Sequence, residues 1–234
     1  MPDLYLVRHA QASFFSASYD ELSPLGLGQA AALGAYWAKQ RLEFEAVYVG
    51  PRRRHRQTCE QVAAAYRDAG LSFPQLVELA ELDEHHGATI IKGALGEDAS
   101  TEALAANAVG AADRERAIKD FFRAYNEIVR EWARGAHAMD GVESWAEFRA
   151  RTLKALDAMC AGAGSGSRVA FTSGGLVASA AGWLLGLDEE RVIDLSLVVR
   201  NTALTEVGWS ARRRRLVSFN ALPHLPDPAA VTAV

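Results

Sequence analysis

Short apolar segments alternate with longer helical patterns along most of this chain of 234 residues. Each apolar run has four to six residues, which suits a buried strand and is too short for a core helix. Strands that alternate with helices favour a mostly parallel central sheet flanked by helices, so we predict a three-layer α/β sandwich. The predicted strands are 4–7, 46–49, 76–79, 168–172, 202–207 and 215–219, the last two joined by a basic turn.

The helices are predicted from capping residues and apolar spacing. Ser23 followed by Pro24 is a favoured helix start. Ser144 and Glu147 have the spacing of a capping box. The predicted helices cover 24–40, 52–69, 113–134 and 144–160, and a further helix opens after Ser173. The stretch 85–142 has one strong helical pattern and no clear strand, so we interpret 1–234 as a single domain with a mainly helical insertion at 88–142 over one end of the sheet.

Composition and charge exclude several classes of protein. Half of the residues are hydrophobic and 23% are charged, which is typical of a globular chain. The net charge of −4 predicts no general attraction to nucleic acid or to an anionic membrane. Two cysteines cannot form a disulfide framework, the first residues lack the pattern expected of a signal peptide, and no apolar run reaches 18 residues. We therefore expect a cytoplasmic protein that binds neither nucleic acid nor membrane, with a homodimer as one option for its oligomeric state.

Polar side chains follow the predicted strands directly. The carboxyl ends of parallel strands meet at one edge of a sheet, where ligands bind, so these side chains are expected to lie close together. They include a histidine, several arginines, carboxylates and a glycine-rich helix start. The residues are Arg8, His9, the basic run 52–56, Glu81, Asp83, Glu84, His85, His86, Ser173, Gly174 and Gly175.

This set of side chains suits a phosphoryl group. Arginine matches phosphate oxygens bidentately, and a helix N-terminus offers N–H groups to an anion. A neutral imidazole can attack phosphorus, while a carboxylic acid protonates the leaving oxygen. Because arginines neutralise the charge, no metal or other cofactor is required. Each of these motifs alone also has a non-functional interpretation, such as a surface Arg–His pair or a solvated acidic loop. It is their joint arrangement at the strand ends that favours a phosphate site.

The same residues resemble the histidine phosphatase superfamily, whose fold is called phosphoglycerate mutase-like. The resemblance covers most of the chain except about 88–140. It rests on Arg8-His9-Ala10, on Gly50-Pro51-x-x-Arg54-x-x-Gln57-Thr58, on Thr172-Ser173-Gly174-Gly175 and on Asn201-Thr202.

The resemblance implies a metal-independent phosphomonoesterase that acts on a small phosphorylated substrate. His9 would be the nucleophile that becomes phosphohistidine, and Arg8 and Arg54 would bind the phosphate. Glu84 would be the proton donor, with Glu81 and Asp83 as alternatives. Further substrate contacts are expected from Gln11, Ser13, Ser173 and Gly174.

Two positions depart from the family pattern. Ala10 replaces a glycine, so its backbone must avoid the conformations that only glycine tolerates. Ser173 replaces the second histidine, as in a branch of the superfamily that is similar here. Loss of one donor to the transition state typically costs about 10²–10³-fold in rate. A compensating histidine would have to come from elsewhere, and His55, His86 and His224 are the candidates.

Alternative functions remain open at this point. A phospho-ligand-binding or regulatory module with weak turnover is one, because of Ser173. A phosphoglycerate-type mutase is less favoured, because 88–140 lacks recognisable mutase features. Specificity is expected from the insertion and from 11–20, where Phe14, Phe15 and Tyr19 either stack on a leaving group or pack under the insertion. The second basic run, 211–215, is interpreted as a solvated turn.

Overall fold

The computed structural model describes residues 3–13, 20–87, 89–90, 111–136, 142–161, 164–210 and 213–233. The chain divides into two compact units. The first unit contains residues 1–84 and 151–234, and the second contains residues 85–150. The single domain with an insertion at 88–142 over the site stays a prediction, and Phe14, Phe15 and Tyr19 lie outside the described residues.

The first unit is built on a six-stranded mixed sheet with the order β3-β2-β4-β1-β5-β6. The four strands from β3 to β1 in this order are parallel, whereas β5 is antiparallel to β1 and β6 is antiparallel to β5. All six predicted strands are therefore confirmed. They are β1 (Asp3–Arg8), β2 (Phe44–Val49), β3 (Leu76–Glu78), β4 (Ser167–Thr172), β5 (Leu204–Trp209) and β6 (Arg214–Ala221).

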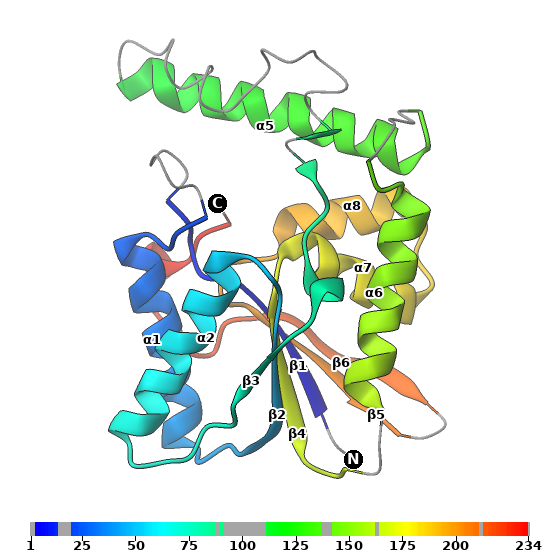
Figure 1. The fold of residues 1–234 in the computed structure, drawn as a ribbon. Helices are drawn as coiled ribbons and strands as arrows, with labels where there is room; N and C mark the ends of the chain where they lie inside the picture. The colour runs from blue at the N-terminus through cyan, green and yellow to red at the C-terminus, as the bar shows by residue number, and fades with distance from the viewer. Residues whose placement is uncertain are drawn as a thin grey trace. The chain divides into compact units, whose positions relative to one another are not determined.

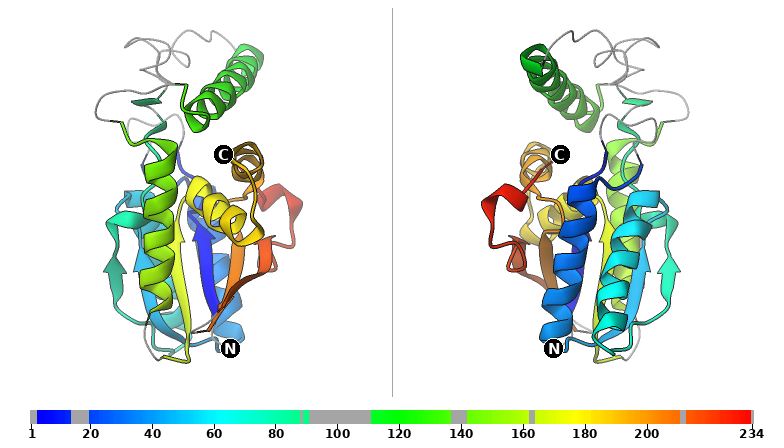
Figure 2. Two further views of the ribbon diagram at one scale, coloured as in Figure 1. Left: turned by 90° about the vertical axis from the view of Figure 1, so that its right-hand side faces the viewer. Right: turned by 90° about the vertical axis from the view of Figure 1, so that its left-hand side faces the viewer.

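Helices cover both faces of this sheet, which confirms the layered architecture (Figures 1 and 2). On one face lie α1 (Pro24–Lys39) and α2 (Arg53–Asp68), and on the other lie α6 (Trp145–Cys160) and α7 (Gly174–Leu185). A further helix, α8 (Glu189–Val198), packs against α7 and was not predicted. Short 3₁₀ turns occur at Ala80–Leu82 and Pro228–Ala230.

The predicted helix starts have the expected capping geometry. The hydroxyl of Ser23 accepts a hydrogen bond from the N–H of Gly26 at 3.0 Å. At the start of α6, the N–H of Ser144 donates to the Glu147 carboxylate at 2.8 Å, and the N–H of Glu147 donates back to the Ser144 hydroxyl at 3.3 Å. These reciprocal bonds satisfy donors that the first turn of a helix leaves open.

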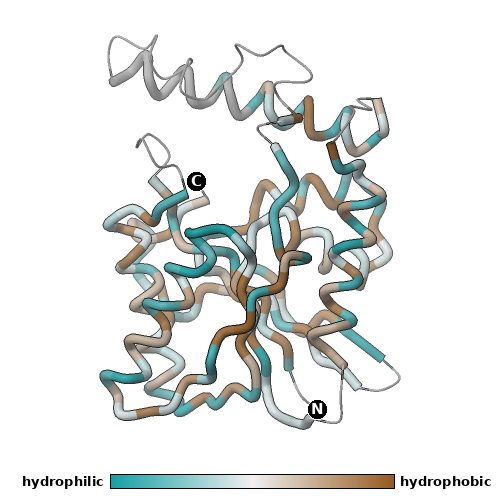
Figure 3. Tube along the Cα trace, viewed as in Figure 1, coloured by the Kyte–Doolittle hydropathy of each residue, from teal (hydrophilic) through white to brown (hydrophobic). Residues whose placement is uncertain are grey.

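Apolar side chains fill the space between the sheet and the α1–α2 layer. Trp37 of α1 meets Phe44 of β2 edge to face, with ring centroids 5.1 Å apart. Tyr66 of α2 and Phe171 of β4 are buried in the same cluster. Figure 3 shows hydrophobic residues gathered along the central strands. Burial of large aromatic side chains dominates the energetics of such a layer, so this core fixes the strands whose ends carry the site.

The turn between β5 and β6 carries the second basic run. Arg214 pairs with Asp157 at 2.5 Å and lies over the Trp183 ring at 6.0 Å. Arg213 and Arg215 are exposed, and Arg212 lies outside the described residues. The hairpin is thus confirmed, and Arg214 of this run packs against other side chains of the first unit.

The second unit contains α5 (Ala111–Ala133) and a buried aromatic cluster. The His85 ring stacks on Trp132 with centroids 5.4 Å apart, and its Nε2 lies 2.8 Å from the Tyr125 hydroxyl. Trp145 and Phe148 pack against Trp132. His85 is therefore held inside this unit by stacking. Across the described parts of both units, no helix is long and apolar enough to cross a membrane.

Candidate active site

His9 follows β1 directly, and its hydrogen bonds define its protonation state. Its Nδ1 lies 2.8 Å from the Ala10 carbonyl, which can only accept, so Nδ1 carries the proton. The Nε–H of Arg54 donates to His9 Nε2 at 3.1 Å, so Nε2 presents its lone pair. Burial, and then the charges of Arg54 and Arg8, lower the pKa of His9 well below its usual value. The imidazole is therefore a neutral base at pH 7.

A hydrogen-bonded network binds the backbone carbonyls of Arg8 and His9. The side-chain amide of Asn201 donates to the His9 carbonyl at 3.0 Å. The N–H of Thr202, a residue with a φ of 58°, donates to the Arg8 carbonyl at 3.0 Å. The Thr202 hydroxyl donates to the Asn201 carbonyl and accepts from His224 Nε2 at 2.9 Å. The sequence motif Asn201-Thr202 thus positions the candidate nucleophile.

The buried His224 predicts a loss of stability in acid. Burial lowers the pKa of His224 from 6.5 to about 4. The unfolded chain therefore takes up this proton near pH 6.5 and the folded chain near pH 4, so stability is complete above 6.5 and declines as the pH falls below it. At pH 5 this histidine alone should lower the free energy of unfolding by about 2 kcal/mol. Urea denaturation of His224→Gln at pH 7 and pH 5 should show a decline smaller by that amount, and an equal decline in both proteins would contradict the assignment.

Arg54 lies in the first turn of α2 and is 5% exposed. Its Nη1 donates to Asp20 at 2.7 Å, while the other oxygen of Asp20 accepts from the N–H of Arg53 at 2.8 Å. Asp20 thus satisfies a donor at the start of α2, where Arg52 makes no capping bond through its side chain to the described residues. Sequence reasoning missed this role of Asp20, because nothing in the local pattern links it to Arg54.

The other candidate phosphate-binding arginine, Arg8, ends β1. Its side chain passes Gly174, where a Cβ atom would lie 3.5 Å from Arg8 Cδ and Nε. Its Nη1 donates to the Val199 carbonyl. Arg8 is close enough to His9 to lower the pKa of that imidazole. The charges of two guanidinium groups, Arg54 and Arg8, therefore act on the neutral imidazole.

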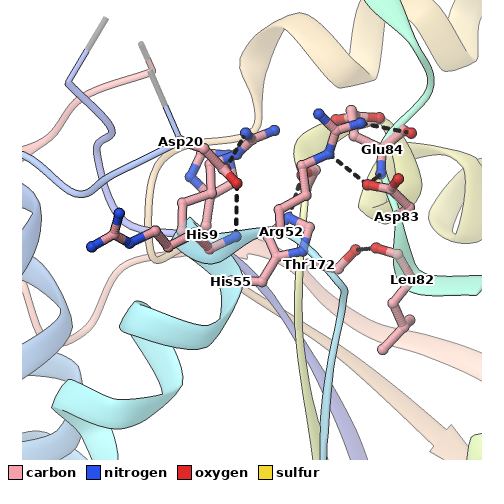
Figure 4. A network of polar contacts seen from close by, with 12 residues as sticks. His9, Asp20, Arg52, His55, Leu82, Asp83, Glu84 and Thr172 are labelled. Atoms are coloured by element: carbon pink, nitrogen blue, oxygen red, sulfur yellow. Dashed lines mark hydrogen bonds and ion pairs between the residues drawn. The ribbon is translucent and has the colours of Figure 1, made fainter. Parts of the chain in front are cut away.

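The remaining arginines of the basic run each meet a carboxylate. Arg53 pairs with Glu21 and Arg56 with Glu78. Arg52 donates to Asp83 at 2.5 Å and to the Glu84 carbonyl at 3.4 Å, so it holds the loop that carries the candidate acid (Figure 4).

The three candidate acids have different surroundings. Glu84 Oε2 accepts from the N–H of Gly175 at 3.0 Å, at the N-terminus of α7. Asp83 is engaged by Arg52 and by the N–H of Glu84. Glu81 pairs with Lys154 at 2.7 Å, and that hydrogen bond lowers the pKa of its carboxyl. Glu84 is thus the carboxylate that the structure places beside the glycine-rich turn.

Ser173 follows β4, next to the end of β1. The N–H of His9 donates to the Thr172 carbonyl at 2.8 Å, which holds the two strand ends together. The Ser173 hydroxyl lies 2.6 Å from His55 Nε2. Of the other two candidate histidines, His224 contacts Thr202, and His86 belongs to the second unit.

The remaining predicted residues lie near these strand ends. The Gln11 side-chain oxygen accepts from the Ser23 hydroxyl at 2.8 Å, and the Ser13 N–H donates to the Glu21 carbonyl at 2.8 Å. Their expected contacts with substrate stay predictions. Among the described residues other than glycine, a positive φ occurs at Arg41, Thr202 and Asn220, so Ala10 avoids the glycine conformation as expected. The described residues contain no group of three or more His, Cys, Asp and Glu side chains that could hold a metal ion.

Comparison with known proteins defines the class. The model of the histidine phosphatase superfamily (branch 1) matches residues 4–89 and 85–222. The chain therefore belongs to the histidine phosphatase superfamily. No curated protein matches the chain.

Several solved structures have a fold similar to that of this chain. Phosphoglycerate mutase from Bacillus anthracis is 17% identical, with 95% of this chain and 94% of that chain covered and a TM-score of 0.62. Phosphoserine phosphatase from Entamoeba histolytica, in complex with 3-phosphoglyceric acid, is 19% identical, with 96% and 100% covered and a TM-score of 0.63. Alpha-ribazole phosphatase from Shigella flexneri is 15% identical, with 94% and 96% covered and a TM-score of 0.63.

Proposed function

We propose that this protein is a phosphatase that hydrolyses small phosphate monoesters through a phosphohistidine on His9, without a metal. The observation that carries the proposal is the neutral His9 imidazole, whose Nε2 lone pair faces the Arg54 guanidinium at 3.1 Å. A nucleophile must be unprotonated, and a transferred phosphoryl group needs cations around its oxygens. His9 supplies the unprotonated nucleophile, and Arg54 supplies a cation beside it.

The reaction divides into two balanced steps. In the first, the His9 Nε2 lone pair forms an N–P bond while the ester P–O bond breaks, and Glu84 gives its proton to the leaving oxygen. Arg8 and Arg54 bind the phosphoryl oxygens. In the second, water attacks phosphorus, its proton goes to the Glu84 carboxylate, and the N–P bond breaks to release inorganic phosphate. Both His9 and Glu84 then return to their starting states.

Proteins of the same fold support the chemical class. Two of the similar solved structures are named as phosphatases of small organic phosphates, phosphoserine and α-ribazole phosphate, and another as a phosphoglycerate mutase. Hydrolysis is favoured here because the sequence of the inserted segment lacks recognisable mutase features. A small organic monoester is thus the substrate class.

The direct test is turnover of an aryl phosphate such as p-nitrophenyl phosphate in the presence of EDTA. We expect release of the phenolate and of inorganic phosphate at a rate that added Mg²⁺ or Zn²⁺ does not raise. Binding of inorganic phosphate without turnover of the aryl phosphate or of a panel of monoesters would contradict the proposal and favour a phospho-ligand-binding module. Transfer between phosphoglycerates faster than hydrolysis would instead identify a mutase.

The acid role of Glu84 predicts a dependence on the leaving group. We expect Glu84→Gln to lower kcat/KM, which reports the transfer of the phosphoryl group to His9, by about 10²–10³-fold for an alkyl phosphate, whose alkoxide must be protonated as it leaves. The loss should be much smaller for p-nitrophenyl phosphate, because that phenolate leaves without a proton. The matched control is Glu81→Gln, which removes the partner of Lys154 and should change neither rate. Equal losses for both substrates would show that Glu84 is not the acid.

A further inference from the structure

The Ser173 hydroxyl is directed at an imidazole instead of at its own helix. Ser173 is the N-cap residue of α7, with φ −112° and ψ 166°, yet its side chain makes no capping bond in the described first turn. Serine at this position ordinarily accepts from an N–H of that turn. Here the Gly175 N–H donates to Glu84 instead, and Ser173 Oγ lies 2.6 Å from His55 Nε2. The hydroxyl is therefore committed to His55.

His55 is enclosed on all sides. Its exposure is 0%, and a Cβ atom added at Gly50 would lie 2.3 Å from its Nδ1, so the absence of a side chain there makes room for the ring. Its ring centroid lies 5.7 Å from that of His9 (Figure 4). Burial, and then the charge of Arg54, lower the pKa of His55 well below its usual value, so the imidazole is neutral and carries one proton at pH 7. With no exposed surface, it has to act on a substrate through another residue.

We propose that His55 and Ser173 together replace the second histidine of the superfamily, with His55 as a positioning residue and Ser173 as the group that touches the phosphoryl oxygen. This inference rests on the proposed function. A hydroxyl has one proton and two lone pairs. In the tautomer that carries its proton on Nε2, His55 donates to one lone pair of the Ser173 hydroxyl. The Ser173 proton is then directed away from His55 and can be donated to a phosphoryl oxygen on His9.

The placement of the pair fits this role. Ser173 follows the strand end that is hydrogen-bonded to the His9 N–H, and Gly174 beside it lies against the Arg8 side chain. His55 is adjacent in sequence to Arg54, which contacts His9. One short segment of α2 therefore supplies both the second arginine and the imidazole that orients Ser173. Position 173 needs no histidine because the imidazole approaches from α2.

A double-mutant cycle tests whether the two residues form one unit. We expect Ser173→Ala and His55→Phe each to lower kcat/KM for an aryl phosphate by about 10²-fold, and the double variant to lose about 10²-fold and not about 10⁴-fold. The inhibition constant of inorganic phosphate should rise in the same pattern. The matched control is Arg56→Ala on the same helix, whose side chain pairs with Glu78 on the surface and whose loss should change neither constant.

The cycle separates a positioning role from a structural one. If His55 only supported the fold, His55→Phe would lower activity as strongly in the Ser173→Ala background as in the unchanged protein, and that result would overturn the inference. His55→Gln, whose amide N–H₂ can donate in place of Nε2–H, should retain most of the activity only when Ser173 is present. If His55→Phe does not fold, His55→Asn, whose shorter amide does not reach Ser173, takes its place in the cycle.

The results also separate a failure of the His55–Ser173 inference from a failure of the proposed phosphatase function. If the unchanged protein hydrolyses neither aryl phosphates nor other monoesters, the proposed function fails, whether or not the protein binds inorganic phosphate, and the inference fails with it. If the unchanged protein turns over and the losses of the two variants multiply, the inference alone fails. Turnover with non-additive losses supports both.

Discussion

The His9→Ala variant is expected to hydrolyse an aryl phosphate at least about 10⁴-fold more slowly than the unchanged protein. The reason is that the His9 Nε2 lone pair, which lies 3.1 Å from the Arg54 Nε, forms the N–P bond of the intermediate. Steady-state release of phosphate, measured in EDTA, provides the rate.

The loss must come from chemistry and not from unfolding. His9 is buried, but its removal takes away one charged-group contact and one short backbone bond, and the Asn201 bond to the backbone carbonyl at position 9 does not depend on the side chain. We therefore expect circular dichroism and the binding of inorganic phosphate to persist in His9→Ala. A variant that is folded and retains the full rate would exclude His9 as the nucleophile.

Arg54→Ala is expected to lower kcat/KM by about 10³-fold. Arg54 is buried and lies 3.1 Å from the His9 lone pair, so its removal costs a donor to the transition-state oxygens and also changes the charge around the nucleophile. The cation lowers the pKa of His9, so the variant should also lose activity at a higher pH than the unchanged protein as the solution is acidified. A pH profile of kcat/KM in both proteins measures this shift.

Two further variants sharpen that result. Arg53→Ala is the matched control, because Arg53 is adjacent in the same helix and pairs with Glu21 on the surface, so the rate should not change. Arg54→Lys keeps the charge but not the planar fork of donors, and we expect it to recover only a small part of the loss. Equal losses of kcat/KM in Arg53→Ala and Arg54→Ala would mean that the basic run acts through its net charge and that Arg54 makes no specific contact with the transition state.

Much of this fold could be predicted because its signals are local. The strands are short apolar runs, and the helices at Ser23 and Ser144 begin with capping residues whose bonds the structure contains. One local signal was overlooked. Asp188 precedes two glutamates and caps α8 by accepting from the Arg191 N–H at 3.0 Å, a pattern that is typical of a helix start.

The contacts that organise the site could not be predicted, because they join residues far apart in sequence. Asp20 meets Arg54 across 34 positions, and His55 meets Ser173 across 118. Asn201 reaches the His9 carbonyl across 192 positions. Such pairs depend on the order of strands in the sheet and on side-chain directions at their ends. The sequence indicated which residue types gather at one edge, and the structure adds which atoms meet.

The covalent intermediate on His9 is the central claim, and trapping it is the most direct measurement. The unchanged protein is mixed with a ³²P-labelled monoester, quenched in alkaline denaturant within milliseconds, and digested for mass spectrometry. We expect label on the peptide that contains His9, stable to alkali, lost in acid and absent from His9→Ala. Label on Ser173, or rapid turnover with no label on the protein at any time, would contradict the account.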